Sequence, residues 1–208
     1  MSRIEGLIFD CDGVMFESRQ ANLAYYNRIL DQFSYPRVAA DNHEQAHLCH
    51  TASSPHVLQG LLHQDDVQQA LDFAASLDYR EFIPYMEPED HLEEILRILQ
   101  PNYPLAIATN RGQSILPILE HFKLKDFFSV VVTSHDVERP KPAPDMLFLV
   151  AEKLQIAPDN CLFIGDSELD QRAAVDAGVQ FAGYGEMVAG DISLRNHLDL
   201  LKYLSGSL

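Results

Sequence analysis

The chain has 208 residues and carries 15 lysines and arginines against 31 aspartates and glutamates, which gives a formal net charge of −16 at pH 7. This acidic balance argues against general nucleic-acid binding, which requires a basic face. The hydrophobic fraction of 47% and the charged fraction of 22% are typical of a soluble globular protein with one large domain, or one domain and a smaller insert. The three cysteines form no CxxC pair, the start leaves no room for a signal peptide, and no apolar run reaches membrane-spanning length. We therefore expect a cytoplasmic protein that does not contact membranes.

The first part of the chain holds one expected strand followed by helices. An apolar run at residues 4–10 predicts a short buried strand, and apolar side chains recur at helical spacing over residues 17–33. Residues 42–78 have a helical composition without a convincing strand. We interpret this region as a helical insert that emerges from the top of a sheet, with hinges near residues 15–18 and 83–88.

After residue 88, strands and helices alternate. In chain order, the expected elements are a helix at 89–100, a strand at 104–110, a helix at 112–122, a strand at 127–134, a helix at 143–155, a strand at 160–167, a helix at 168–178 and a strand at 179–184. This alternation predicts an α/β fold with a parallel sheet and right-handed crossovers.

Polar clusters follow four of the expected strands, where the carboxyl ends of parallel strands meet at one crevice. They are Asp10-Cys11-Asp12-Gly13, Thr109-Asn110-Arg111-Gly112, Lys141 within "ERPKPAPD", and Asp166 to Asp170 within "GDSELD". Each cluster also has an ordinary structural explanation: a turn, a helix N-cap, a solvated lysine or an acidic helix start. Four clusters in this order, all at strand ends, favour one shared site.

The residue types in these clusters suit phosphate and metal chemistry. Two residues apart, Asp10 and Asp12 place both carboxylates on one side of an extended chain. The hydroxyl, amide and backbone N–H groups at residues 109–112 suit phosphate oxygens. The carboxylates of Asp166 and Asp170, one helical turn apart, suit a hard cation with oxygen ligands, for which Mg²⁺ is the natural choice beside a phosphate.

These motifs together resemble the haloacid dehalogenase superfamily of hydrolases. "FDCDGVMFES" matches its DxDG[TV] motif, "IATN" its Ser/Thr motif, Lys141 in "RPKPAPD" its lysine motif, and "FIGDSELD" its GDxxxD motif. The resemblance implies a Rossmann-like three-layer core at residues 1–16 and 87–208. It also implies a small helical cap at residues 17–86, similar to the subfamily that contains phosphoglycolate phosphatases and β-phosphoglucomutase.

The resemblance also implies a role for each matched residue. Asp10 is the expected nucleophile that forms an aspartyl-phosphate, and Asp12 the expected general acid and base. The expected Mg²⁺ ligands are an Asp10 oxygen, the Asp12 backbone carbonyl, Asp166, and Asp170 directly or through a water.

The same resemblance assigns the phosphate contacts. Thr109, the Asn110 backbone and Lys141 are expected to stabilise charge on the transferring phosphoryl oxygens. Lys141 is also expected to help keep Asp10 ionised. An additional arginine, Arg111, is either a substrate contact or a helix-surface charge.

The intact acidic set favours phosphoryl chemistry over dehalogenation, because halide loss requires neither a proton nor a metal. We therefore predict a Mg²⁺-dependent phosphatase for a small phosphorylated metabolite, resembling phosphoglycolate or a sugar phosphate, in a monomer or weak homodimer. A phosphomutase with the same residues and a non-catalytic phospho-acceptor or binding protein remain as alternatives.

Three histidines of the insert, His43, His47 and His50, recur at helical spacing. A zinc site is conceivable, but we favour a polar helix face. A weaker alternative is that one of these histidines meets the leaving group of the substrate.

Overall fold

The computed structural model describes residues 3–205 and is built on a six-stranded sheet with the strand order β5-β4-β1-β6-β7-β8. All neighbouring strands are parallel. The strands are β1 (Gly6–Phe9), β4 (Leu105–Thr109), β5 (Val130–Thr133), β6 (Cys161–Gly165), β7 (Gln180–Tyr184) and β8 (Ile192–Leu194). The predicted α/β fold with a parallel sheet is confirmed.

Strand β1 lies in the centre of the sheet because it is apolar on both faces. All four of its residues are buried, as expected for a strand covered by helices on both sides. The register pairs Phe9 with Ile107 of β4 on one side and with Ile164 of β6 on the other. The polar residues that follow these three strands therefore leave the sheet at the same edge.

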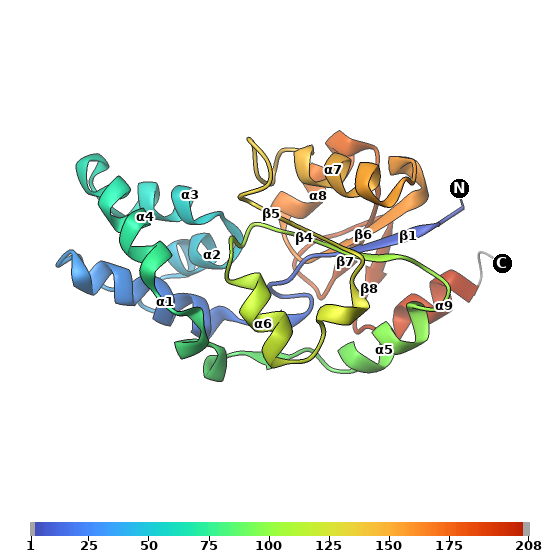
Figure 1. Ribbon diagram of the computed structural model, residues 1–208, viewed down its shortest axis with the longest axis horizontal. Helices are drawn as coiled ribbons and strands as arrows, with labels where there is room; N and C mark the ends of the chain where they lie inside the picture. The colour runs from blue at the N-terminus through green and yellow to red at the C-terminus, as the bar shows by residue number, and fades with distance from the viewer. Residues whose placement is uncertain (1–2, 206–208) are drawn as a thin grey trace.

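Helices cover both faces of the sheet (Figure 1). Helices α5 (Leu92–Leu99), α6 (Ile115–His121) and α9 (Asp199–Ser205) contribute to one apolar cluster with residues of the sheet. Helices α7 (Asp145–Leu154) and α8 (Glu168–Ala177) contribute to a second cluster. The result is the predicted three-layer arrangement.

Four further helices lie together at one end of the molecule (Figure 1). They are α1 (Arg19–Gln32), α2 (His43–Thr51), α3 (Ser54–Leu61) and α4 (Val67–Ser76). A third apolar cluster joins them, with Ile29, Leu30, Val57 and Leu58 almost completely buried. The insert therefore has a hydrophobic core of its own, and we propose residues 17–86 as the cap and residues 1–16 and 87–208 as the core.

The two connections between sheet and insert run side by side. Strand β2 (Phe16–Glu17) pairs in antiparallel fashion with β3 (Glu87–Pro88). These short strands coincide with the segments expected to act as hinges. Both connections to the insert therefore leave the core at the same place.

The sequence analysis missed the last part of the fold. Strand β8 has only three residues, of mixed polarity, and pairs with β7, while α9 follows it. Such a short strand carries no periodicity long enough to be recognised. Within residues 3–205, no helix combines the length and the apolar character needed to cross a membrane.

Candidate active site

The predicted polar residues meet at the carboxyl edge of the sheet. Asp10 directly follows β1, and its backbone N–H donates to the Ile164 carbonyl of β6 at 2.9 Å. Thr109 is the last residue of β4, and Asp166 directly follows β6. The parallel topology thus brings together residues that lie more than 150 positions apart in the chain.

Three carboxylates form a compact buried cluster. One oxygen from each of Asp10, Asp166 and Asp170 lies within 4.8 Å of the others. In the chain between residues 3 and 205, this is the one group of three or more His, Cys, Asp or Glu side chains arranged to hold a metal ion. Its donors are all carboxylate oxygens, which hard cations such as Mg²⁺ prefer.

Lys141 is the cation that the fold itself places against this cluster. Its Nζ lies 2.8 Å from Asp10 Oδ1 and 2.6 Å from Asp170 Oδ1, and donates a hydrogen bond to the Ala108 carbonyl at 3.0 Å. The lysine is 3% exposed. A single buried ammonium therefore faces three carboxylates, so the cluster has an excess of negative charge.

The pKa values of the cluster reflect this excess. Burial, followed by the Asp170 charge, raises the pKa of Asp10 to about 7, although Lys141 works in the opposite direction as expected. Burial and the neighbouring Asp170 and Asp10 carboxylates raise the pKa of Asp166 to about 8. Asp10 Oδ1 accepts no hydrogen bond of good geometry from the described residues. A further cation fits this site, because Lys141 alone does not offset burial and repulsion.

The Asp170 side chain has both oxygens engaged by the protein. Oδ1 pairs with Lys141, and Oδ2 accepts hydrogen bonds from the Ser167 hydroxyl at 2.5 Å and the Ser167 backbone N–H at 3.2 Å. The Ser167 hydroxyl in turn caps helix α8. This capping box fixes Asp170 at the helix start. Of the two predicted contacts of Asp170 to a metal, direct or through a water, this arrangement favours the second.

The carboxylate of Asp12 lies outside the acidic cluster. Its Oδ1 accepts hydrogen bonds from the Ser18 hydroxyl, from Asn22 Nδ2 at 3.0 Å and from Arg111 Nη2 at 2.5 Å. Its negative charge still reaches the cluster, because it contributes to the raised pKa values of Asp10 and Asp166. Burial favours the neutral acid, but the charges of Arg111 and His50 outweigh it and lower the pKa of Asp12.

Gly13 makes the turn after Asp10 possible. Its φ of +71° lies in the left-handed region, and a Cβ on Gly13 would lie 1.9 Å from Asp166 Oδ2. Only a residue without a side chain allows the turn and the Asp166 carboxylate to occupy this space together.

Thr109 and Asn110, at the end of β4, make different contacts. The buried Thr109 hydroxyl accepts a hydrogen bond from the Arg111 backbone N–H at 3.1 Å. Asn110 Nδ2 donates to the Thr51 carbonyl of the insert at 3.0 Å and to the Lys141 carbonyl at 3.1 Å. The Asn110 side chain therefore joins core and insert, which leaves its backbone for the predicted phosphate contact.

The insert contributes polar residues that sequence motifs did not reveal. Asn22 of α1 bonds Asp12, and its Oδ1 accepts from Arg111 Nη2 at 2.9 Å and from the Tyr79 hydroxyl at 3.2 Å. His50 of α2 is buried, and its Nε2 lies 3.9 Å from Asp166 Oδ2. A weak signal was available for His50 in the helical spacing of the insert histidines, but none was available for Asn22 or Tyr79.

The three insert histidines do not share a metal site. His47 Nε2 lies 2.8 Å from Glu168 Oε1 at the surface, whereas His50 is buried at the site. His43 is exposed at the start of α2. His43 and His47 lie on a polar helix face, as the favoured interpretation predicts. His50 fits the weaker alternative, in which one histidine lies near the leaving group.

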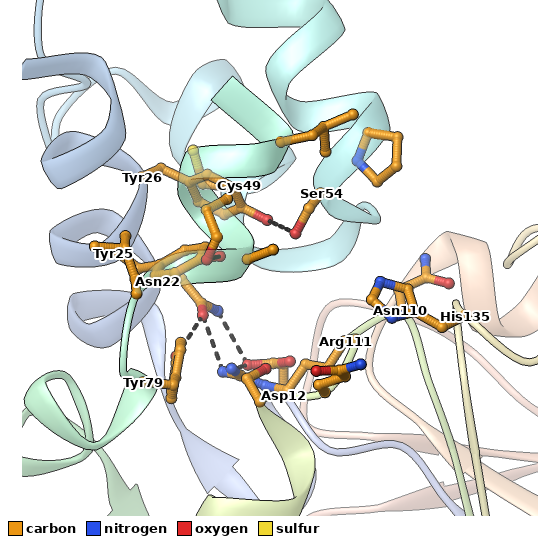
Figure 2. A pocket seen from close by; sticks show the side chains of 18 of the residues that line it. Asp12, Asn22, Tyr25, Tyr26, Cys49, Ser54, Tyr79, Asn110, Arg111 and His135 are labelled. Carbon is orange, nitrogen blue, oxygen red and sulfur yellow. Dashed lines mark hydrogen bonds and ion pairs between the residues drawn. The ribbon is translucent and has the colours of Figure 1, made fainter. Parts of the chain in front are cut away.

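A cavity of about 580 Å³ lies between insert and core. Figure 2 shows Asp12, Asn22, Tyr79 and Arg111 gathered at one end of it, and Tyr26 with Ser54 at the insert end. Asp12 lines this cavity, whereas Asp10, Asp166 and Asp170 of the acidic cluster do not.

Comparison with known proteins identifies the family. The model of the haloacid dehalogenase-like hydrolases matches residues 7–184. The chain belongs to this family. A HAD-superfamily hydrolase of subfamily IA, variant 1, from Geobacter sulfurreducens is 37% identical and superimposes with a TM-score of 0.84, over 97% of this chain and 100% of that one.

Two further proteins are similar to the chain, one in part of its sequence and the other in fold. Phosphoglycolate phosphatase of Escherichia coli (strain K12) is 41% identical over 106 residues, which cover 47% of this chain and 42% of that protein. The match thus spans less than half the length of this curated relative. A β-phosphoglucomutase from Clostridium difficile, 16% identical with a TM-score of 0.83 over 98% of this chain and 96% of its own, shares the fold.

Proposed function

We propose that this member of the hydrolase family is a Mg²⁺-dependent phosphatase that acts on a small phosphorylated metabolite, phosphoglycolate-like or sugar-phosphate-like, through an aspartyl-phosphate intermediate. The observation that carries the proposal is the buried cluster of Asp10, Asp166 and Asp170 beside Lys141 at the carboxyl edge of the sheet. The similarity to phosphoglycolate phosphatase over part of the chain supports the same reaction class.

Asp10 is the proposed nucleophile. One of its carboxylate oxygens attacks phosphorus, forming an Asp10–phosphorus bond while the bond from phosphorus to the ester oxygen breaks. Its position directly after the central strand holds the carboxylate in place, since the Asp10 backbone is bonded to β6. Water then attacks the aspartyl-phosphate and releases inorganic phosphate, which restores the Asp10 carboxylate.

Asp12 is the proposed general acid and base. In its protonated form it gives a proton to the leaving ester oxygen in the first step, so that the product leaves as an alcohol, and as a carboxylate it takes a proton from the attacking water in the second, which restores the protonated form. The charge of Arg111 lowers the pKa of Asp12 and favours the carboxylate, whereas the negative charge of a bound phosphate opposes this effect. Its carboxylate borders the cavity rather than the acidic cluster, and this placement suits a group that serves the leaving oxygen.

The residues proposed to hold Mg²⁺ are Asp10, Asp166, the Asp12 backbone carbonyl, and Asp170 through a water. When bound, the ion would supply positive charge that offsets the repulsion between an anionic nucleophile and an anionic phosphate. The raised pKa values of Asp10 and Asp166 support this assignment, because both carboxyl groups gain from a further cation.

Thr109, the Asn110 backbone and Lys141 are the proposed contacts of the transferring phosphoryl oxygens. The Thr109 hydroxyl and the Lys141 ammonium are buried at the strand ends next to Asp10. Fixed donors at such a position cost no reorganisation during the reaction.

The insert is proposed to act as a cap that excludes water during attack on phosphorus. Contacts between insert and core support this role: Asn110 bonds the Thr51 carbonyl, His47 pairs with Glu168, and Asn22 bonds Asp12. A cytoplasmic location and a monomeric or weakly dimeric state remain predictions.

An assay of inorganic phosphate release tests the proposal. With p-nitrophenyl phosphate as substrate, we expect turnover in the presence of Mg²⁺, loss of turnover with EDTA, and recovery when excess Mg²⁺ is added. Labelling of the protein without turnover would instead identify a phospho-acceptor. With a sugar phosphate, isomerisation in place of phosphate release would identify a mutase.

A further inference from the structure

Arg111 is a buried cation beside the proposed general acid and base. It lies two residues after Thr109, the last residue of β4, and is only 8% exposed. The expected alternative of a charge on a helix surface is wrong, because Arg111 is buried and precedes helix α6. Its Nη2 donates to Asp12 Oδ1 at 2.5 Å. The charged group of Arg111 therefore bonds a residue that the proposed reaction uses.

The hydrogen bonds to the Asp12 side chain all meet the same carboxylate oxygen. Oδ1 accepts from the Ser18 hydroxyl, from Asn22 Nδ2 at 3.0 Å and from Arg111 Nη2. Oδ2 accepts no hydrogen bond from residues 3–205 and is not fully buried. Figure 2 shows Asp12, Asn22 and Arg111 gathered at one end of the cavity, which Asp12 lines. Oδ2 is therefore the oxygen of Asp12 that remains available to a molecule in the cavity.

Arg111 is itself held in place at both ends. Its backbone N–H donates to the Thr109 hydroxyl at 3.1 Å. Its guanidinium carbon lies 4.9 Å from the centroid of the Tyr79 ring, and Nη2 also donates to Asn22 Oδ1 at 2.9 Å. A guanidinium group that is stacked on a ring and hydrogen-bonded has few orientations left. Arg111 can therefore impose an orientation on the Asp12 carboxylate.

We propose that Arg111 is a positioning residue for the general acid and base: by holding Asp12 through Oδ1, it directs Oδ2 to the oxygen atoms that exchange protons. This inference rests on the proposed phosphatase function and adds a residue to it. Oδ2 gives its proton to the ester oxygen as the bond from that oxygen to phosphorus breaks, and it later takes a proton from the water that attacks the aspartyl-phosphate. Arg111 acts through Asp12, because its guanidinium already bonds Asp12 and Asn22 and stacks on Tyr79.

Loss of the positioning residue should impair proton transfer while the nucleophile stays intact, so its effect depends on the leaving group. Benzyl alcohol needs a proton to leave, whereas p-nitrophenolate leaves without one. Benzyl phosphate and p-nitrophenyl phosphate are similar in size, so the ratio of their kcat/KM values with Mg²⁺ isolates the acid step. We expect Arg111→Gln to lower kcat/KM by about tenfold to a hundredfold for benzyl phosphate, part of the factor that general acid catalysis supplies, and by less than about threefold for p-nitrophenyl phosphate.

Asp12→Asn provides the decisive background for a second measurement. An amide does not replace the carboxylic acid as a proton donor, so Arg111 then has no acid to orient. Residues that act through one another have non-additive effects, and the further change Arg111→Gln in the Asp12→Asn protein should lower the single-turnover rate with benzyl phosphate by less than about twofold. A full further loss in the double variant would show that Arg111 acts on the substrate directly and would overturn the proposal.

Tyr79→Leu tests the same role with the charge of Arg111 in place. Without the ring the guanidinium is less restricted, so the ratio of kcat/KM for benzyl phosphate to that for p-nitrophenyl phosphate should fall, but by less than in Arg111→Gln. Arg80→Gln is the matched control, because Arg80 also lines the cavity but is exposed and paired with Asp78, and it should change the ratio by less than about twofold. The proposal is wrong if a folded Arg111→Gln protein keeps the wild-type ratio. If urea unfolding shows that this variant does not fold, an unchanged ratio in Tyr79→Leu decides against the proposal.

Failure of the proposed function has a different signature. In that case the wild-type protein with Mg²⁺ would release no phosphate from either ester. A wild-type ratio in Asp12→Asn would refute Asp12 as the general acid, and the role of Arg111 would fall with it. If Asp12→Asn lowers the ratio and Arg111→Gln does not, the phosphatase and its acid stand and only the role of Arg111 is overturned.

Discussion

The core side and the insert side of the candidate active site are built from different kinds of contact. On the core side, Asp10, Asp166 and Asp170 crowd around Lys141, so like charges oppose one another and the fold holds them in place. On the insert side the side chains are neutral: Asn22 bonds Asp12 and Arg111 of the core, and Tyr79 donates to Asn22 and stacks against Arg111.

This difference separates two tasks. Carboxylates held against their mutual repulsion are suited to binding a cation and to attacking phosphorus. The ends of the strands that precede them fix their positions. Neutral side chains on the insert, which we propose to be a cap, are suited to orienting charged groups of the core. We therefore expect changes on the core side to affect the chemical step, and changes on the insert side to affect how well the acid and the leaving group are placed.

The largest expected effect is that of Asp10→Asn. Loss of the nucleophile should lower kcat by at least about 10⁴-fold, while removal of one charge from a crowded cluster should leave the free energy of unfolding without Mg²⁺ unchanged or higher. Steady-state kinetics and urea unfolding measure both quantities. Asp126→Asn, the same change at an exposed position, should alter neither kcat nor the free energy of unfolding. Wild-type turnover by Asp10→Asn would refute the assignment of Asp10 as the nucleophile.

Gly13→Ala tests whether the turn after Asp10 is indispensable. The methyl group would collide with Asp166 Oδ2 and adopt an unfavourable φ, so we expect a loss of about 2 kcal/mol in the free energy of unfolding and a severe loss of activity. Gly178→Ala is a suitable control, because its φ of +67° is similar but its Cβ meets no described atom within 4 Å. Equal effects of the two substitutions on activity would show that the loss in Gly13→Ala comes from backbone strain and not from the contact with Asp166.

A smaller effect is expected from Asn22→Ala on the insert side. The substitution removes hydrogen bonds to Asp12, Arg111 and Tyr79, so kcat/KM should fall by about tenfold to a hundredfold. Asn27→Ala, in the same helix, loses two hydrogen bonds to the Val38 backbone instead. This control should lower stability without lowering kcat/KM, and a comparable loss of activity in both variants would contradict a specific role for Asn22.

The smallest expected effect on activity concerns His197, which bonds the loop after β1. Its Nε2 bonds the Val14 carbonyl at 2.7 Å, and burial lowers its pKa to about 4. Because this folded-state pKa lies below the ordinary value of about 6.5, His197 stays neutral in the fold while the unfolded chain takes up a proton. The contribution of His197 to the free energy of unfolding is therefore complete above pH 6.5. It falls by about 2–3 kcal/mol as the pH falls towards 4.

Urea unfolding of wild type and His197→Gln between pH 7 and pH 4.5 measures this contribution as a difference. Asp10 and Asp166, whose raised pKa values act in the opposite direction, titrate in both proteins and cancel. The stability gap between the two proteins should narrow as the pH falls. A constant gap over this range would show that His197 titrates normally.

The sequence by itself determined the parallel sheet and the core side of the site. Strand periodicity is local, and parallel strands end at one edge, so the residues after β1, β4 and β6 were bound to meet there. Asp10, Thr109, Asp166 and Asp170 were found in this way, and Lys141 in the loop after β5. A helical composition without a strand was enough to recognise the insert.

Tertiary structure alone decided the insert side and the direction of the Asp12 carboxylate. Asp12 and Arg111 are 99 residues apart, Asn22 and Tyr79 are 57 apart, and Val14 and His197 are 183 apart. No local pattern records such pairs, because each depends on how the helices dock on the sheet. The physical reason is that burial makes an unpaired polar group costly, and only the packed fold reveals which partner satisfies it.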